Sequence, residues 1–217
     1  MSASCCDHNH AHAPGTSGPE QASYRRALWA VLIINAAMFA VEIAAGYAAG
    51  SASLQADALD FLGDAANYAL SLTVVGMALR YRAMAAMLKG VSMLAFGLWV
   101  TGTVVWHAIN GTLPNATTMG AIGFTALAAN AAASAILWAY RSGDANMRSA
   151  WICTRNDVLG NLAVLLAALG VFGTGAGWPD LLVAIVMAGL ALQGAFLVLR
   201  QAQGELRAAP AAVAAAE

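Results

Sequence analysis

Six long apolar runs constrain what this chain can fold into more than any other feature. Each run is about 20 residues long, which is the length that an α-helix needs to cross the hydrocarbon core of a bilayer. Turn-forming pairs such as Gly50-Ser51 and Asn110-Gly111 separate them. The sequence therefore predicts an all-α membrane protein with six transmembrane helices. The runs are Ala27–Ala49, Leu54–Leu79, Leu88–Ile109, Thr118–Tyr140, Ala150–Phe172 and Leu181–Leu199.

The composition excludes the main soluble classes. Only 10% of the residues are charged, whereas a soluble domain carries about 25%. The net charge of −1 leaves no basic surface for nucleic acid. The three cysteines do not form a disulfide framework, and the polar start of the chain is not a signal peptide. We therefore expect a lipid bilayer as the main partner, and no nucleic acid.

The basic residues predict an orientation. Nine of the ten Lys and Arg residues lie outside or at the very edge of the six runs, all on one side, and the loops on the other side contain none. Because cytoplasmic loops are enriched in Lys and Arg, both termini are predicted to be cytoplasmic. The tenth, Arg155, lies inside the fifth run, points away from Asp157 on a helix, and is expected to reach toward the cytoplasm. The nine are Arg25, Arg26, Arg80, Arg82, Lys89, Arg141, Arg148, Arg200 and Arg207.

The ends of the chain are short. We predict a flexible cytoplasmic tail at residues 1–22, a six-helix transmembrane domain at residues 23–201 and a short cytoplasmic tail at residues 202–217. The first tail holds five thiol and imidazole groups within eight residues, and such groups bind Zn²⁺ and softer ions. It is either a metal-capturing segment or a solvated tail with a chance cluster. The five residues are Cys5, Cys6, His8, His10 and His12.

Acidic residues inside the apolar runs carry the strongest functional signal. A charged side chain at the bilayer centre costs about 2.5–3.5 kcal/mol. Protons, a partner or a bound cation must therefore neutralise such groups. The first, second and fifth runs contain five of them: Glu42, Asp57, Asp60, Asp64 and Asp157.

The spacing of these residues favours a cation site. Asp60 and Asp64 stand four residues apart, as do Cys153 and Asp157, so each pair shares one helix face. Two antiparallel helices would bring three oxygens and a sulfur together near mid-membrane, a donor set that suits Zn²⁺ or softer divalent ions. The alternative is ordinary helix–helix packing, above all for the cysteine. The predicted ligands are Asp60, Asp64, Cys153 and Asp157, with Asp57, Asn156, Asn161 and Glu42 as candidate accessory residues.

Three motifs resemble those of the cation diffusion facilitator family of divalent-metal/proton antiporters. The resemblance covers about residues 24–201. It departs from the family at Cys153, where the family usually has histidine. The motifs are segment 53–64 (SLQADALDFLGD), then Asn35, Phe39, Glu42 and Gly46, and finally Asn146, Arg148, Ala150, Cys153 and Asp157.

The resemblance implies a cation efflux fold whose transport site is lined by the four predicted ligands. It also implies that the family's usual C-terminal cytoplasmic domain is missing after Arg200, which leaves a homodimer and metal regulation open. We expect no enzyme and no prosthetic group, but a transporter in the bacterial inner membrane that exports Zn²⁺, Cd²⁺ or Co²⁺ in exchange for protons. A non-transporting metal-binding subunit is the alternative. An intramembrane aspartyl protease is disfavoured, because its usual Gly-x-Gly-Asp motif is absent around Asp64.

Overall fold

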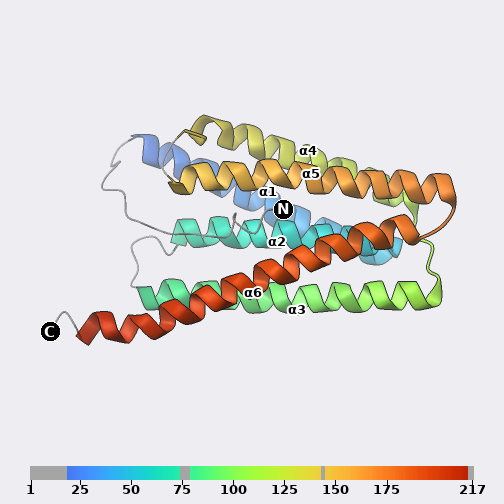
Figure 1. Cartoon of the computed structure of the whole chain (residues 1–217). Helices are drawn as coiled ribbons and strands as arrows, with labels where there is room; N and C mark the ends of the chain where they lie inside the picture. Colours follow the sequence, from blue (N-terminus) through green and yellow to red (C-terminus); the bar gives the residue numbers. More distant parts are fainter. Residues whose placement is uncertain (1–18, 74–78, 143–144, 215–217) are drawn as a thin grey trace.

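The computed structural model describes residues 19–73, 79–142 and 145–214, and the regular secondary structure within them is entirely helical (Figure 1). The prediction of an all-α chain with six long helices is confirmed for this part of the chain. Cys5, Cys6, His8, His10 and His12 lie outside the described residues. The helices are α1 (Pro19–Ala49), α2 (Ala52–Thr73), α3 (Leu79–Asn110), α4 (Ala116–Leu137) followed by the 3₁₀ turn η2 (Trp138–Tyr140), α5 (Ala145–Thr174) and α6 (Trp178–Ala214).

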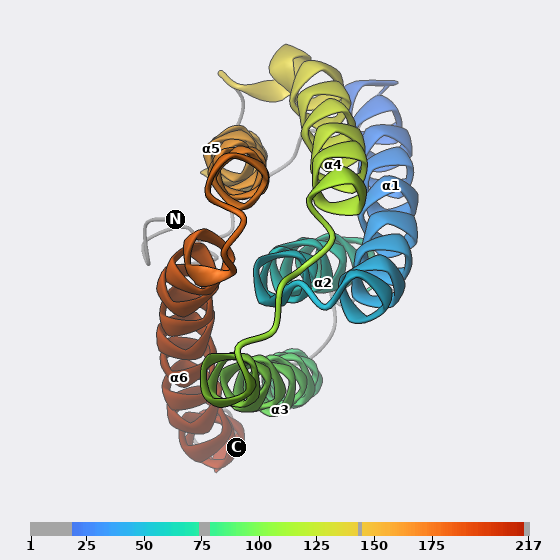
Figure 2. The ribbon, with the colours of Figure 1, turned by 90° about the vertical axis from the view of Figure 1, so that its right-hand side faces the viewer.

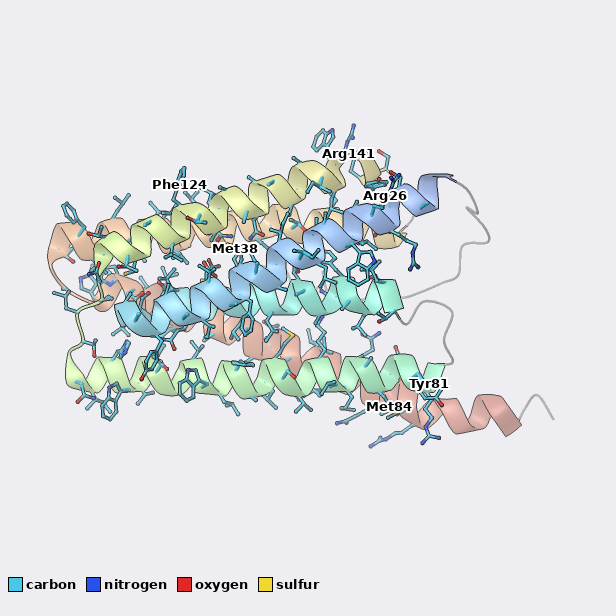
Figure 3. All side chains as sticks on the ribbon, turned by 180° about the vertical axis from the view of Figure 1, so that it is seen from behind. Arg26, Met38, Tyr81, Met84, Phe124 and Arg141 are labelled. Atoms are coloured by element: carbon cyan, nitrogen blue, oxygen red, sulfur yellow. The ribbon has the colours of Figure 1, made fainter. Side chains whose placement is uncertain are left out.

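Most of these helices have the length and composition of membrane spans. Among the described residues, five are long and apolar enough to cross a bilayer: Ala22–Ala49, Ala83–Asn110, Ala116–Tyr140, Thr154–Thr174 and Trp178–Arg207. Helix α2 is the sixth and is less apolar, because three aspartates interrupt it. Large apolar side chains such as Phe124 are exposed on the outside of the bundle, as a lipid-facing surface requires (Figure 3).

Several helix boundaries differ from the predicted runs. Helix α2 ends at Thr73, short of the predicted Leu79, which is instead the first residue of α3. Lys89 therefore lies ten residues inside α3, not in a loop. Helix α6 continues to Ala214, beyond the predicted end at Leu199. Hydropathy marks only the part of a helix that matches the hydrocarbon, whereas the backbone hydrogen bonds of the helix continue into its polar flanks.

Helix α2 occupies the middle of the bundle, as the view along the helix axes shows (Figure 2). It contacts α1, α3, α5 and α6, while α4 packs against α1 and α5 on the outside. Every residue from Ala52 to Phe61 is buried. The polar side chains of α2 therefore face neighbouring helices and not lipid, which is the usual place for ionisable groups in a membrane bundle.

The start of α2 is held by specific contacts. Gly50 adopts a left-handed conformation (φ 65°), which a side chain would disfavour, and this lets the chain reverse direction directly after α1. The carboxylate of Asp180, in the first turn of α6, accepts hydrogen bonds from the backbone N–H of Ala52 (2.8 Å) and from Ser51 Oγ (2.7 Å) and Ser53 Oγ (2.6 Å). It thereby satisfies free donors at the N-terminus of α2 and ties that end to α6.

Helices α3 and α6 form a closely packed pair. A Cβ atom on Gly90 would lie 2.8 Å from the Leu199 side chain, and one on Gly97 would lie 2.7 Å from Leu192. The two glycines are seven residues apart, as are the two leucines, so both contacts repeat along the same two helix faces. Small residues allow helices in a membrane to approach closely. This pair forms one wall beside α2.

Candidate metal site

The acidic stripe of α2 lies inside the bundle. Asp57, Asp60 and Asp64 are exposed by 1%, 6% and 8%, respectively. The i, i+3 and i+7 spacing places them along adjoining faces of one helix. Burial of three carboxyl groups in one helix requires partners for their oxygen atoms, since an unpaired buried charge is costly.

Asp64 of α2 faces Asp157 of α5, and their carboxyl groups lie within hydrogen-bonding reach when one of them carries a proton. Tyr68, one turn further along α2, donates its hydroxyl proton to Asp64 Oδ2 (3.1 Å). The same hydroxyl is hydrogen-bonded to Thr154 Oγ1 of α5. Asp157 is also buried, and its Oδ2 has no hydrogen-bond partner among the described residues. The structure thus brings together two of the predicted ligands, one from each predicted helix.

Gly160 of α5 makes room for the other acids of the stripe. A Cβ atom on this glycine would lie 3.7 Å from Asp60 Oδ2 and 3.9 Å from Asp57 Oδ1. It would also lie 3.7 Å from Met187 Cε of α6. Asp60 Oδ2 has no hydrogen-bond partner in the described part of the chain. The carboxyl groups of α2 therefore face α5 at a point where α5 presents only backbone.

A second pair of carboxyl groups lies between α1 and α2. Glu42 and Asp57 are almost fully buried, and their carboxyl groups are within hydrogen-bonding reach of each other if one carries a proton. No donor among the described residues bonds any of their four oxygen atoms. This pair connects the acids of α2 to α1. Two of the four predicted accessory residues, Glu42 and Asp57, therefore lie beside each other.

The two accessory asparagines on α5 differ in their surroundings. Asn161 is buried; it donates to the backbone carbonyl of Asp157 (2.8 Å), and its own Oδ1 has no partner in the described structure. Asn156 Oδ1 accepts a hydrogen bond from Arg155 (3.3 Å). The Arg155 guanidinium is exposed and lies 5.2 Å from the Trp151 ring centre. Asn161 therefore lies on the side of α5 that carries Asp157, while Arg155 contacts the ring of Trp151 on the same helix.

The described residues hold these acids as pairs. In this part of the chain, no three Asp, Glu, His or Cys side chains gather closely enough to hold a metal ion. The side chain of Cys153, which the sequence nominates as the fourth ligand, lies outside the described residues. The set of Asp60, Asp64, Cys153 and Asp157 therefore stays a prediction, with the contact between Asp64 and Asp157 as its structural core.

Sequence reasoning placed one cation wrongly. The charge pattern counts Lys89 among the cytoplasmic basic residues between the second and third runs, yet its side chain is only 7% exposed and its ammonium group donates a hydrogen bond to Asn67 Oδ1 of α2. It also lies close enough to Asp64 to act on that carboxyl group. The apolar run that starts at Leu88 predicts a helix start at the membrane surface there, whereas α3 begins at Leu79 and its packing carries Lys89 inside the bundle.

Two further residues beside the acids were not singled out from the sequence. Tyr68 follows Asp64 by one helical turn, and this spacing was a usable signal for a contact between the two side chains. Asp180 stands in the first turn of α6, where an acid ordinarily stabilises its own helix. Its role at the start of α2 depends on the packing of α6 against α2, which no local pattern reveals.

The fold and the buried acids together define a polytopic membrane protein with ionisable groups enclosed at its centre, an arrangement typical of ion transporters. Residues 28–206 match the cation efflux transmembrane domain, and the chain belongs to this family. The family is one of transporters and not of enzymes. Together with the apolar helices and the bacterial relatives, this membership makes the chain an integral protein of the bacterial inner membrane.

Proteins of similar sequence are named as bacterial metal transporters. The chain is 28% identical over 216 residues to the zinc transporter ZitB of Escherichia coli, an alignment that covers 92% of this chain and 67% of ZitB. It is 23% identical over 209 residues to a cadmium, cobalt and zinc/H(+)-K(+) antiporter of Bacillus velezensis, covering 89% of this chain and 64% of the relative. The chain thus spans about two thirds of the length of these relatives.

Proposed function

We propose that this protein exports divalent transition-metal ions of the Zn²⁺, Cd²⁺ and Co²⁺ class from the cytoplasm in exchange for protons. The observation that carries the proposal is the contact between the buried carboxyl groups of Asp64 on α2 and Asp157 on α5. The names of the relatives, a zinc transporter and a cadmium, cobalt and zinc antiporter, support the class of ion.

The proton exchange rests on competition for the same oxygen atoms. Two buried carboxylates in contact repel each other, so the empty pair needs at least one proton. A metal ion binds only the deprotonated groups and therefore releases that proton when it enters. With Asp60 and Cys153 as the further ligands, one site would exchange protons for metal as it is exposed first to one side of the membrane and then to the other.

The direction of transport rests on the distribution of positive charge. Arg26 and Arg141 lie at the same end of the bundle, at which α1 begins and α6 ends (Figure 3). Arg25 and Arg80 also belong to helix segments at this end and are exposed. Because basic residues accumulate on the cytoplasmic side, this end is assigned to the cytoplasm. The N-terminal cluster around Cys5 and His8 would then capture metal beside the cytoplasmic opening.

Proteoliposomes with the purified full chain test the proposal. A metal-sensitive dye inside the vesicles measures the uptake of Zn²⁺, Cd²⁺ and Co²⁺, and a second dye measures the internal pH. Antiport predicts that metal uptake makes the lumen more alkaline, because protons leave as metal enters. Binding of metal without uptake would instead favour a non-transporting metal-binding subunit. Glu205→Gln, which removes a carboxylate that contacts Gln201 at the far end of α6, is the matched control.

The identity of the fourth ligand has its own test. A thiolate favours soft ions, an imidazole is borderline and a hydroxyl is a poor ligand. Cys153→Ser should therefore weaken the binding of both Zn²⁺ and Cd²⁺, whereas Cys153→His should retain Zn²⁺ and lower the preference for Cd²⁺ by about tenfold, or about 1.4 kcal/mol. Competition titrations with the two ions measure this. Unchanged affinities for Cys153→Ser would make this residue a packing side chain.

A further inference from the structure

A single lysine is buried in the described part of the bundle. Lys89 lies in α3 and is 7% exposed, and its ammonium group donates to Asn67 Oδ1 of α2. The arginines whose side chains are described are all exposed: Arg25, Arg26, Arg80, Arg141, Arg155, Arg200 and Arg207. A long basic side chain ordinarily extends toward water. Lys89 instead keeps its charge within the helix bundle, and such a charge needs a counterpart there.

The counterpart lies on the acidic stripe. Asn67 follows Asp64 by three residues and so lies on the same side of α2, one turn nearer the end at which α2 stops. The Lys89 ammonium group is close enough to act on the Asp64 carboxyl group. Across the interface of α3 with α2, Lys89 therefore faces the carboxyl group of Asp64. Asp64 in turn lies beside Asp157 of α5.

We propose that Lys89 sets the affinity of the carboxyl site for divalent metal, because its hydrogen bond to Asn67 fixes a positive charge beside Asp64. This inference rests on the proposed metal site. A fixed positive charge balances the acids while the site is empty and repels a divalent ion twice as strongly as a monovalent one. A transported ion must bind tightly enough to enter but weakly enough to leave. Lys89 shifts this balance toward release.

The competing explanation is that Lys89 only connects α3 to α2. The two roles predict opposite results. Loss of a structural hydrogen bond lowers the stability of the protein and does not improve metal binding. Loss of a repelling charge tightens metal binding, an effect that a loosened structure does not produce. A variant that removes the charge but keeps the length of the side chain therefore separates them.

The test is calorimetric titration of Zn²⁺ into the purified full chain in lipid nanodiscs. Lys89→Met removes the charge and keeps the apolar stem, and Lys89→Gln removes the charge but keeps a donor for Asn67. Both should bind Zn²⁺ about tenfold more tightly than the unmodified protein, equivalent to about 1.4 kcal/mol. Their maximal transport rate should fall, because release becomes slower. Lys89→Arg keeps the charge and should bind Zn²⁺ within about twofold of the unmodified protein.

Arg80→Met is the matched control, since it removes an exposed cation from the same helix; it should leave Zn²⁺ affinity unchanged. The proposal is overturned if Lys89→Gln and Lys89→Met bind Zn²⁺ no more tightly than the unmodified protein. It is also overturned if Arg80→Met tightens binding equally, because the effect would then be one of net charge. Failure of the metal site itself looks different: the unmodified protein and Asp64→Asn would then bind Zn²⁺ equally.

Discussion

Two groups of buried acids lie on or against α2, and their oxygen atoms are satisfied to different extents. At the start of α2, Asp180 accepts four hydrogen bonds from residues 51–53. Near the middle of the helix, both oxygens of Glu42 and of Asp57 and one oxygen of Asp60 have no donor among the described residues. Most buried polar atoms in proteins have a partner. The first acid therefore completes the fold, whereas the second group leaves buried oxygen atoms that no donor among the described residues satisfies.

The same comparison separates the two ends of the stripe. Asp64 accepts a hydrogen bond from the Tyr68 hydroxyl and lies close enough to the Lys89 ammonium group to interact with its charge. Asp157 faces Asp64 from α5. No donor among the described residues bonds the oxygen atoms of Glu42 and Asp57, which lie beside each other. A carboxylate that has donors tolerates its charge better than one without them. The end of the stripe at Asp64 is therefore the better candidate for binding a metal ion, and the predictions below test this distinction.

The largest effect is expected from Asp64→Asn. The variant keeps the shape of the side chain but removes the charge, so Zn²⁺ uptake by proteoliposomes should fall by about 100-fold or more. The purified variant should still be monodisperse and unfold cooperatively on heating. Glu42→Gln, the equivalent change in the other pair, should retain Zn²⁺ affinity within about threefold. Wild-type uptake by Asp64→Asn would show that this residue is not a ligand.

A smaller effect is expected from filling the space at Gly160. A Cβ atom there makes only ordinary contacts with Asp60 Oδ2 and Met187 Cε (both 3.7 Å), so Gly160→Ala should transport Zn²⁺ at nearly the normal rate. The two additional methyl groups of Gly160→Val reach further toward the acids, and uptake should fall about tenfold through overpacking. Initial rates of Zn²⁺ uptake measure both variants. Equal rates would show that metal does not pass this point of α5.

Tyr68→Phe should have a modest effect. It removes the hydroxyl that donates to Asp64 and bonds Thr154, but it keeps the packing of the ring. We expect the Zn²⁺ concentration for half-maximal uptake to change by about threefold, which is the size of one modest hydrogen bond. Thr154→Val removes only the hydrogen bond between Tyr68 and Thr154, so it should change the Zn²⁺ concentration for half-maximal uptake less. A loss of transport as complete as in Asp64→Asn would instead give Tyr68 a direct role at the metal.

The smallest effect on transport is expected from Asp180→Asn. The amide cannot replace all the hydrogen bonds that the carboxylate accepts, so the free energy of unfolding should fall by about 1–3 kcal/mol. Zn²⁺ affinity should remain within about twofold, because Asp180 lies in α6 beside the start of α2 and not among the stripe acids. Thermal unfolding and Zn²⁺ titration of the same sample measure both quantities. A large loss of affinity without a loss of stability would remove the distinction between the two groups of acids.

Several features of the site could be predicted from the sequence because they are local. Asp60 and Asp64 are four residues apart, and helix geometry alone puts them on one face. The apolar runs determine that the chain forms six long helices, since a backbone in lipid must satisfy its own hydrogen bonds. The matching motifs predict a site between the second and fifth helices; this site stays a prediction, and the structure places Asp64 and Asp157 beside each other.

The remaining features depend on which helices meet in space. No local pattern states that α2 is enclosed by its neighbours, that Glu42 contacts Asp57, or that Asp180 of α6 holds the start of α2. Lys89 is the clearest case. Its neighbours in the sequence suggested a loop at the membrane surface, but α3 begins ten residues earlier and its packing against α2 carries the lysine inside. The sequence determined the helices and the spacing of their acids through backbone geometry, whereas only tertiary packing decided which buried oxygen atoms receive a donor and which remain open.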